Sequence, residues 1–153
     1  MSRRETIRMT PDEIDAFVAT CRTLHVASHN ADGTIHLVPM WFAHFDGALA
    51  FWTYAKSQKI VNLRRDPHVT VMLESGDVYE ELKGITVTGT ARIVDDLEEV
   101  LRFGELVYER YWGPITDDAI RMGVRAMGAK RVVVTVDADT TVSWDHAKLG
   151  GAY

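Results

Sequence analysis

The most restrictive feature of this sequence is the close succession of three extended segments between residues 24 and 54. The first begins at Leu24, has a hydrophobic period of two, and ends at the turn residues Asn30-Ala31-Asp32-Gly33. Asp46-Gly47 is typical of a tight hairpin. The three predicted strands cover residues 24–29, 34–42 and 48–53. Because parallel strands need long crossover connections, strands this close together indicate an antiparallel barrel or sandwich.

Clear helix and turn signals separate the remaining elements. Thr10-Pro11-Asp12-Glu13 combines an N-cap, a proline in the first turn and an acidic third residue, which predicts a helix over residues 11–21. Pro39 marks an edge or a bulge in its strand. Further helices are predicted over 56–65, over 95–111 and after Pro114 with Thr116 as N-cap, and further strands over 68–74, 84–94 and 130–136. We therefore expect one mainly β domain, residues 1–153, with six antiparallel strands and peripheral helices.

Composition and charge argue against several classes of partner. The net charge of −5 leaves no basic surplus to neutralise the phosphates of a nucleic acid. No run of the chain approaches the roughly 18 apolar residues of a membrane span. The single cysteine, Cys21, excludes an internal disulfide, fits a reducing compartment, and is expected to be a small buried residue at a helix end. We expect a cytoplasmic protein without a nucleic-acid or membrane partner.

The motifs that usually define a catalytic centre are missing. The sequence has no glycine-rich dinucleotide or phosphate loop, no nucleophile elbow and no paired Cys or His ligands. Of the six histidines, His25, His29 and His36 lie around one hairpin, and solvated or hydrogen-bonded side chains are the preferred interpretation. Acidic pairs such as Asp95-Asp96 are interpreted as solvated or as helix N-terminal charges. No residue is identified as catalytic, and no metal site is expected.

The segment with the clearest chemical character leads from a predicted strand into a helix. A strand 39–42 is expected to pair with 50–54, which continues directly into Lys56-Ser57-Gln58-Lys59. This order places the hydroxyl groups of Thr53 and Ser57 and two ammonium groups beside the free N–H donors of a helix start, which favours a phosphate. The alternative is an ordinary basic first turn, although lysine there opposes the helix dipole. The residue types alone leave both interpretations open.

Spaced residues in this part of the chain also carry a family resemblance. They are Thr53, Lys56, Ser57, Lys59, Asn62, Leu63, Asp66, Pro67 and Val69. Their spacing resembles the phosphate-binding stretch of the pyridoxamine-phosphate-oxidase-like split-barrel flavoproteins, and the hairpin with residues 38–42 and the strand 84–93 resemble theirs. The ending Ser143-Trp-Asp-His-x-Lys-Leu-Gly-Gly151 is similar to that of the actinobacterial branch that uses the deazaflavin coenzyme F-420. The resemblance covers nearly the whole chain and implies an FMN-binding-like split β-barrel.

The resemblance also implies a homodimer with two cofactor sites in grooves between the subunits. It implies that Thr53, Lys56, Lys59 and Asn62 hold the cofactor phosphate, and that residues 39–41 lie along the ring system. Two interpretations of Trp144 and His146 stay open: they reach the same groove from the other subunit, or they form a packed C-terminal anchor. The predicted cofactor site therefore comprises Pro39, Met40, Trp41, Thr53, Lys56, Ser57, Lys59, Asn62, Trp144 and His146.

The implied activity is transfer of a hydride from reduced F-420 to an activated double bond of a small conjugated organic substrate. Two alternatives stay open: an FMN-dependent oxidoreductase of the same fold, and a non-catalytic protein that binds a cofactor or haem. Pyridoxamine-phosphate oxidation itself is disfavoured, because the tail offers only Lys148 where those enzymes carry further basic residues. The sequence does not choose the source of the completing proton among solvent, a histidine and Tyr79, and Tyr79 is a candidate for the lining of the substrate mouth.

Overall fold

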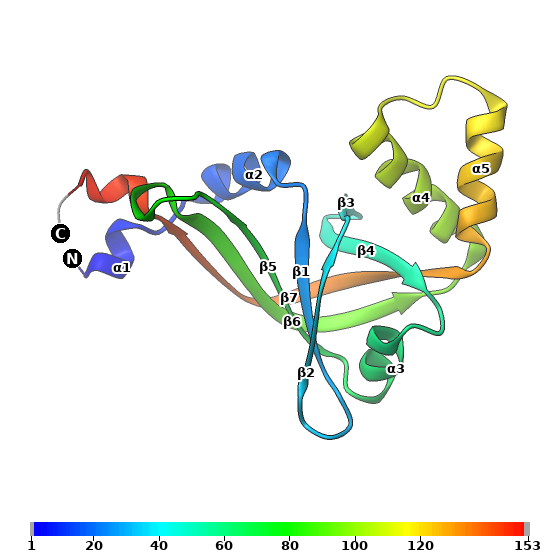
Figure 1. Ribbon diagram of the computed structural model, residues 1–153, viewed down its shortest axis with the longest axis horizontal. Helices are drawn as coiled ribbons and strands as arrows, with labels where there is room; N and C mark the ends of the chain where they lie inside the picture. Colours follow the sequence, from blue (N-terminus) through cyan, green and yellow to red (C-terminus); the bar gives the residue numbers. More distant parts are fainter. Residues whose placement is uncertain (1, 152–153) are drawn as a thin grey trace.

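The computed structural model describes residues 2–151, which form one antiparallel sheet with helices around it (Figure 1). The strands are β1 (Leu24–His29), β2 (Ile35–Met40), β3 (Ala43–Phe45), β4 (Ala48–Tyr54), β5 (His68–Ser75), β6 (Lys83–Val94) and β7 (Arg131–Asp145). The helices are α1 (Arg3–Thr6), α2 (Pro11–Thr20), α3 (Gln58–Arg65), α4 (Leu97–Trp112) and α5 (Asp118–Gly128), with short 3-10 helices η1 (Tyr79–Glu81) and η2 (His146–Leu149). The mainly β, antiparallel prediction is confirmed, with seven strands in place of six.

The additional strand arises because the predicted strand 34–42 divides in two. Along the sheet the order is β2-β1-β5-β6-β7-β4-β3, so the two halves lie at opposite ends of that order. The predicted pairing of 39–42 with 50–54 is therefore wrong: Met40 pairs with Leu24 of β1, and the segment 50–54 pairs with β7. The edge position expected for Pro39 is confirmed, because β2 has β1 as its single neighbour in the sheet.

Between β2 and β3, the Tyr111 side chain of α4 takes the place of a neighbouring strand as hydrogen-bond partner of the backbone. The backbone N–H of Phe42 donates to the hydroxyl of Tyr111 at 3.0 Å, and that hydroxyl donates to the carbonyl oxygen of Arg22 at 2.8 Å. The Phe42 side chain is fully buried beneath this contact. Here the chain leaves β2 and crosses to the other end of the sheet order. The backbone N–H of Phe42, which has no strand partner at this point, is satisfied by the phenol of Tyr111.

The last strand, β7, is much longer than the strand that its hydrophobic pattern predicted. The pattern predicted residues 130–136, whereas β7 continues to Asp145 and pairs with β6 along almost its whole length. Residues 137–142 are exposed, so they lack the apolar face from which a strand is recognised in a sequence. A register shift between Thr88 and Gly89 of β6 marks an irregularity in this ladder. Figure 1 shows the long β6–β7 ribbon bending from the α5 end of the molecule to α1 and η2.

Two groups of buried side chains form the core. The larger group lies between the sheet, α2 and α3, and includes the fully buried Phe42, Phe51 and Ile60. The smaller group lies where α4 covers β3, β4 and β7, and is centred on the fully buried Phe103. Leu24 and Val26 are buried as their alternation predicted. The two groups fix both faces of β4, the strand that leads into the predicted phosphate segment.

All four predicted helix starts agree with the structure to within two residues. Thr10 and Glu13 form the expected capping box at the start of α2, and Asp96 caps α4. The predicted cap Thr116 is corrected to Asp117, whose carboxylate accepts from the N–H of Ile120 at 2.9 Å. A carboxylate is the stronger cap there because it also carries a charge that complements the helix dipole.

The predicted burial of the one cysteine is also confirmed. Cys21 follows the last residue of α2 and is 7% exposed. Burial raises the pKa of its thiol, which keeps the less reactive protonated form.

Glycine at position 104 is required by close packing of α4 on the sheet. A Cβ atom there would lie 2.7 Å from the indole of Trp52, whereas a Cβ at Gly123 on α5 would have no neighbour within 4 Å. We expect Gly104→Ala to lower the free energy of unfolding by about 1–3 kcal/mol through overpacking. Gly123→Ala is the matched control and should raise it by about 0.5–1 kcal/mol through helix propensity. Urea unfolding measures both, and shifts of the same sign would contradict this account of the packing.

Candidate functional site

Three predicted site residues form a polar cluster where β4 leads into α3. The ammonium of Lys59 donates to Thr53 Oγ1 at 3.1 Å, and that hydroxyl donates to Ser57 Oγ at 3.3 Å. Thr53 is buried, and Lys59 and Ser57 are half-buried. The series of hydrogen bonds ends at Ser57, whose own O–H can donate to a ligand.

The electrostatics of this cluster favour an anion. Burial lowers the pKa of Lys59, and no charged group within residues 2–151 counters that effect. The first turn of α3 contains no acidic side chain, and Ser57, at the N-cap position, does not cap the helix. The N–H groups of this turn therefore have no side-chain acceptor, and together with the ammonium they provide donors for a phosphate.

Asn62, a further predicted phosphate ligand, is hydrogen-bonded to protein groups on both sides of its amide. Its side chain is fully buried, and its amide nitrogen donates to Ser28 Oγ at 3.2 Å and to Asn30 Oδ1 at 2.9 Å. Its amide oxygen accepts from Gln58 at 2.9 Å. The geometry joins α3 to the β1–β2 hairpin and so positions the helix that carries Lys59. Direct contact of Asn62 with a phosphate stays a prediction.

A pocket of about 220 Å³ adjoins the cluster. It brings together Thr53 and two further predicted residues, Met40 and Trp41. The Trp41 ring is stacked on that of Tyr111, with centroids 4.3 Å apart and planes 9° apart, which holds the half-exposed indole in one orientation. Pro39 and Lys56 are exposed beside these residues in the chain.

The sequence analysis did not identify Arg131 as a residue of this pocket. Its guanidinium lies over the rings of Trp52 and Tyr54, at 4.7 Å and 4.6 Å from their centroids, and donates to the carbonyl oxygen of Met127 at 2.8 Å. All three side chains line the pocket. The register that sets Tyr54 opposite Arg131 joins strands more than 70 residues apart, so no local pattern indicates it. The sequence indicated only that Arg131 is a basic residue at the start of a strand rich in β-branched residues, which does not by itself predict a place in a pocket.

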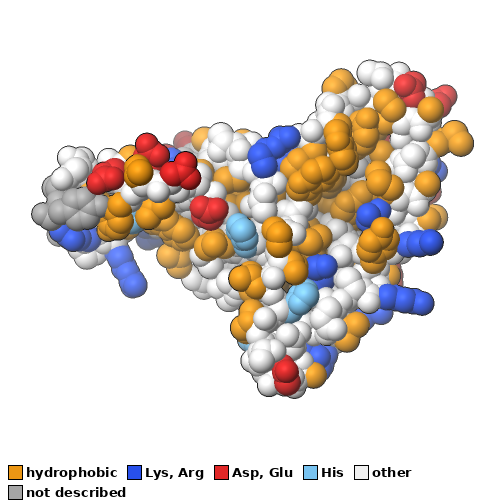
Figure 2. Space-filling model, in the orientation of Figure 1, with side chains coloured by type: hydrophobic (Ala, Val, Ile, Leu, Met, Phe, Trp, Pro, Cys, Tyr) orange, Lys and Arg blue, Asp and Glu red, His pale blue; other side chains and the backbone are white. Residues whose placement is uncertain are grey.

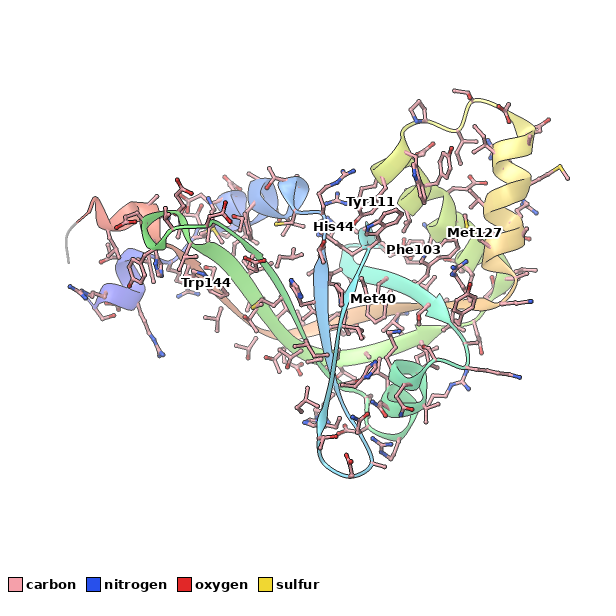
Figure 3. The ribbon with its side chains drawn as sticks, viewed as in Figure 1. Met40, His44, Phe103, Tyr111, Met127 and Trp144 are labelled. Atoms are coloured by element: carbon pink, nitrogen blue, oxygen red, sulfur yellow. The ribbon has the colours of Figure 1, made fainter. Side chains whose placement is uncertain are left out.

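Trp144 and His146 lie in a different part of the folded molecule from the pocket at Thr53. Figure 3 shows Met40 near the middle of the molecule and Trp144 near the α1 end. Trp144 and His146 line a separate pocket of about 680 Å³. His146 Nδ1 lies 2.9 Å from the carbonyl oxygen of Tyr79, and the two rings are 4.4 Å apart. A single chain therefore brings Met40, Trp41 and Thr53 together but leaves Trp144 and His146 apart from them.

The histidines near α3 are hydrogen-bonded, as their interpretation predicted. His29 Nδ1 and His68 Nδ1 lie 3.1 Å and 2.6 Å from the two carboxylate oxygens of Asp66. The hydrogen bond to His68 is the main cause that lowers the pKa of Asp66. Within the described part of the chain, no group of three or more His, Cys, Asp or Glu side chains is placed to hold a metal ion. Among the helices of residues 2–151, none combines the length and apolar character needed to cross a membrane.

Comparisons with known proteins agree on one family. A family model described as pyridoxamine 5'-phosphate oxidase matches residues 10–145. A conserved hypothetical protein of Mycobacterium tuberculosis is 46% identical, with a TM-score of 0.92, and the match covers 100% of this chain and 95% of that one. No curated protein matches the chain.

Two further solved structures show the range of proteins with this fold. An F-420 reductase is 26% identical, with a TM-score of 0.65 and coverage of 83% of this chain and 94% of that one. The haem storage protein HutZ of Vibrio cholerae is 17% identical, with a TM-score of 0.69 and coverage of 90% and 97%. At that identity, the likeness to HutZ shows the fold alone.

Proposed function

We propose that this chain, which belongs to the pyridoxamine 5'-phosphate oxidase family, is a homodimeric oxidoreductase that binds the deazaflavin coenzyme F-420. In its reduced form the bound coenzyme supplies a hydride, here to an activated double bond of a small conjugated organic substrate. The observation that carries the proposal is the half-buried Lys59 ammonium, which is hydrogen-bonded to a hydroxyl but not paired with a carboxylate in residues 2–151. A half-buried ammonium without a carboxylate partner in the chain can form its ion pair with an anionic ligand.

The donor set fits the phosphate of such a cofactor. Lys59 supplies a charge, Ser57 supplies a hydroxyl, and the uncapped first turn of α3 supplies backbone N–H groups. Thr53 holds the ammonium in position, and Lys56 adds a second charge from the exposed side of the turn. Met40 and Trp41, from the adjoining pocket, provide a hydrophobic surface for a planar ring.

The homodimer is part of the proposal because one chain does not complete the predicted site. Met40 and Trp144 lie far apart in Figure 3, so Trp144 and His146 reach the ring only from a partner chain. Exposed apolar side chains on the edge strand β2, Ile35 and Leu37, support an interface, since they are 55% and 64% exposed. His146 and the adjacent Tyr79 would then accompany Trp144 to this groove, and both can supply a proton.

The choice of F-420 is supported by the likeness to an F-420 reductase at 26% identity. FMN is the second candidate, because the same cluster of Lys59, Thr53 and Ser57 suits any cofactor phosphate. The test is a titration of the purified protein with oxidised F-420 and, separately, with FMN, followed by quenching of its tryptophan fluorescence. Trp41 and Trp52, which line the pocket, serve as reporters. Preferential binding of F-420 is expected; preference for FMN would move the protein to the flavin branch, and binding of neither would overturn the proposal.

The affinity for the cofactor should depend on pH through Lys59. Because burial lowers the pKa of this ammonium, it loses its proton at a pH below the usual value of about 10.4. We expect the Kd for F-420 to increase as the pH is raised from 7 towards about 10. Lys59→Arg is the matched variant, since a guanidinium stays protonated throughout this range and should remove the dependence.

The stability of the free protein should change with pH in the opposite direction. The lowered pKa of Lys59 means that the folded state binds fewer protons than the unfolded state between the two pKa values. Stability from this group therefore rises as the pH increases through that window. Unfolding and binding measured at the same series of pH values separate the two effects, and a Kd that stays constant for the wild type would contradict the role of Lys59.

A further inference from the structure

The pocket at the α1 end of the molecule has the size of a ligand site. Its volume of about 680 Å³ is within the range of small-molecule sites. Its lining comes from the end of β7, with Val142 and Trp144, and from the segment that runs from Arg4 to Arg8. Val142 is 57% exposed, so an apolar surface is open to a ligand. Trp144 lies against Gly84 of β6, where a Cβ atom would overlap the indole. The ring is therefore fixed in one place.

The segment that carries the arginines is held on β7 by hydrogen bonds. The N–H of Asp145 donates to the carbonyl oxygen of Ile7 at 2.7 Å, and the N–H of Met9 donates to Ser143 Oγ at 3.0 Å. Lys148 donates to the carbonyl oxygen of Arg8 at 2.8 Å and to the Glu13 carboxylate at 2.6 Å. Both ends of residues 7–9 are therefore tied to the strand or to η2. The backbone position of Arg8 over the pocket is set by the fold.

The pocket lining carries more basic than acidic side chains, with two arginines and one glutamate. Arg4 and Arg8 both line it, and within residues 2–151 neither forms an ion pair. The one carboxylate in the lining, that of Glu5, accepts from the N–H of Ser2 at 2.6 Å. Figure 2 shows Lys and Arg side chains projecting at this end of the molecule beside hydrophobic ones. Two arginines and a tryptophan in the lining of one pocket match a ligand that is both planar and negatively charged.

We propose that this pocket binds the carboxylate group of a planar, conjugated substrate, with Arg4 and Arg8 at the carboxylate and Trp144 along the ring. The inference rests on the proposed function, in which this end of one subunit closes the cofactor groove of the other. To the proposed function it adds that the substrate is negatively charged, a property that the cofactor site does not determine. A guanidinium binds a carboxylate through two parallel N–H donors, so the pair of arginines selects for an acid over a neutral analogue of the same shape.

Isothermal titration with 2-naphthoate and with 2-naphthylmethanol tests the inference without any cofactor. The two probes share the ring system and differ in charge. The wild type should bind the acid at least about tenfold more tightly than the alcohol, and the double variant Arg4→Gln/Arg8→Gln should lose this preference. Arg3→Gln is the matched control, because Arg3 is on the same short helix but does not line the pocket. It should behave as the wild type.

Two results would overturn the inference: no binding of 2-naphthoate by the wild type, or equal binding by the wild type and the double variant. A parallel titration with F-420 distinguishes its failure from that of the proposed function. Binding of F-420 without binding of 2-naphthoate overturns only the assignment of this pocket. Binding of 2-naphthoate without binding of F-420 or FMN overturns the proposed function, and with it the role of the pocket in holding a substrate.

Discussion

Lys59→Met should weaken the binding of the cofactor by about 10- to 150-fold, the largest effect on function that we expect from a single substitution. The variant keeps the length and the apolar stem of the side chain but removes the ammonium. A hydrogen bond to a charged group contributes about 1.5–3 kcal/mol, which corresponds to this range of affinities. The fold should be retained, because the pKa of Lys59 shows that burial of its charge is itself unfavourable. The Kd of the cofactor from tryptophan fluorescence measures the loss.

The control for this variant is Arg64→Met, an exposed basic residue on the same helix. It removes one positive charge from α3 at a distance from the first turn, and its Kd should stay close to that of the wild type. Lys56→Met should have an intermediate effect, since Lys56 is exposed and water screens its charge. Equal losses for Lys59→Met and Arg64→Met would show that net charge, and not the geometry at Thr53, controls binding.

Asn62→Ala should lower the free energy of unfolding by about 1–3 kcal/mol, because the variant leaves the buried hydroxyl of Ser28 without its donor. It also removes the contact between α3 and the β1–β2 hairpin. Cofactor affinity should fall as a secondary effect, since α3 carries Lys59. Urea unfolding and the cofactor titration measure the two effects on the same preparation.

Asn30→Ala serves as the matched control for Asn62→Ala. It removes one partner of the Asn62 amide at a half-buried position, where water can take the place of the missing oxygen. Its cost in stability should be the smaller of the two. A variant Asn62→Ala with unchanged stability and strongly reduced cofactor binding would contradict the structural role and favour the direct phosphate contact that the family resemblance implies.

Local signals were sufficient for most of the elements. The hairpin at Asp46-Gly47 forms as predicted, with positive φ at both residues, 50° and 83°, which is the requirement of a type I′ turn. The capping box of Thr10 and Glu13 starts α2 as predicted. The order of Thr53, Ser57 and Lys59 along the chain already places a strand end next to a helix start. Each of these features forms through interactions between residues within a few positions of one another. A short stretch of sequence is therefore enough to predict it.

The tertiary structure alone decided which strands are neighbours and what surrounds the site. Met40 pairs with Leu24 and not with β4. At Phe42, which is buried and bonded through its N–H to Tyr111, the chain crosses to the other end of the sheet order. The exposed residues 137–142 form a strand because β6 offers them backbone partners.

The composition of the pocket was decided in the same way. Arg131 enters it through its register with Tyr54, and Asn62 is buried through its hydrogen bonds to Ser28 and Asn30. In each case the partner is distant in the chain. The free energy that selects it comes from burial and hydrogen bonding between segments, which local propensity does not contain.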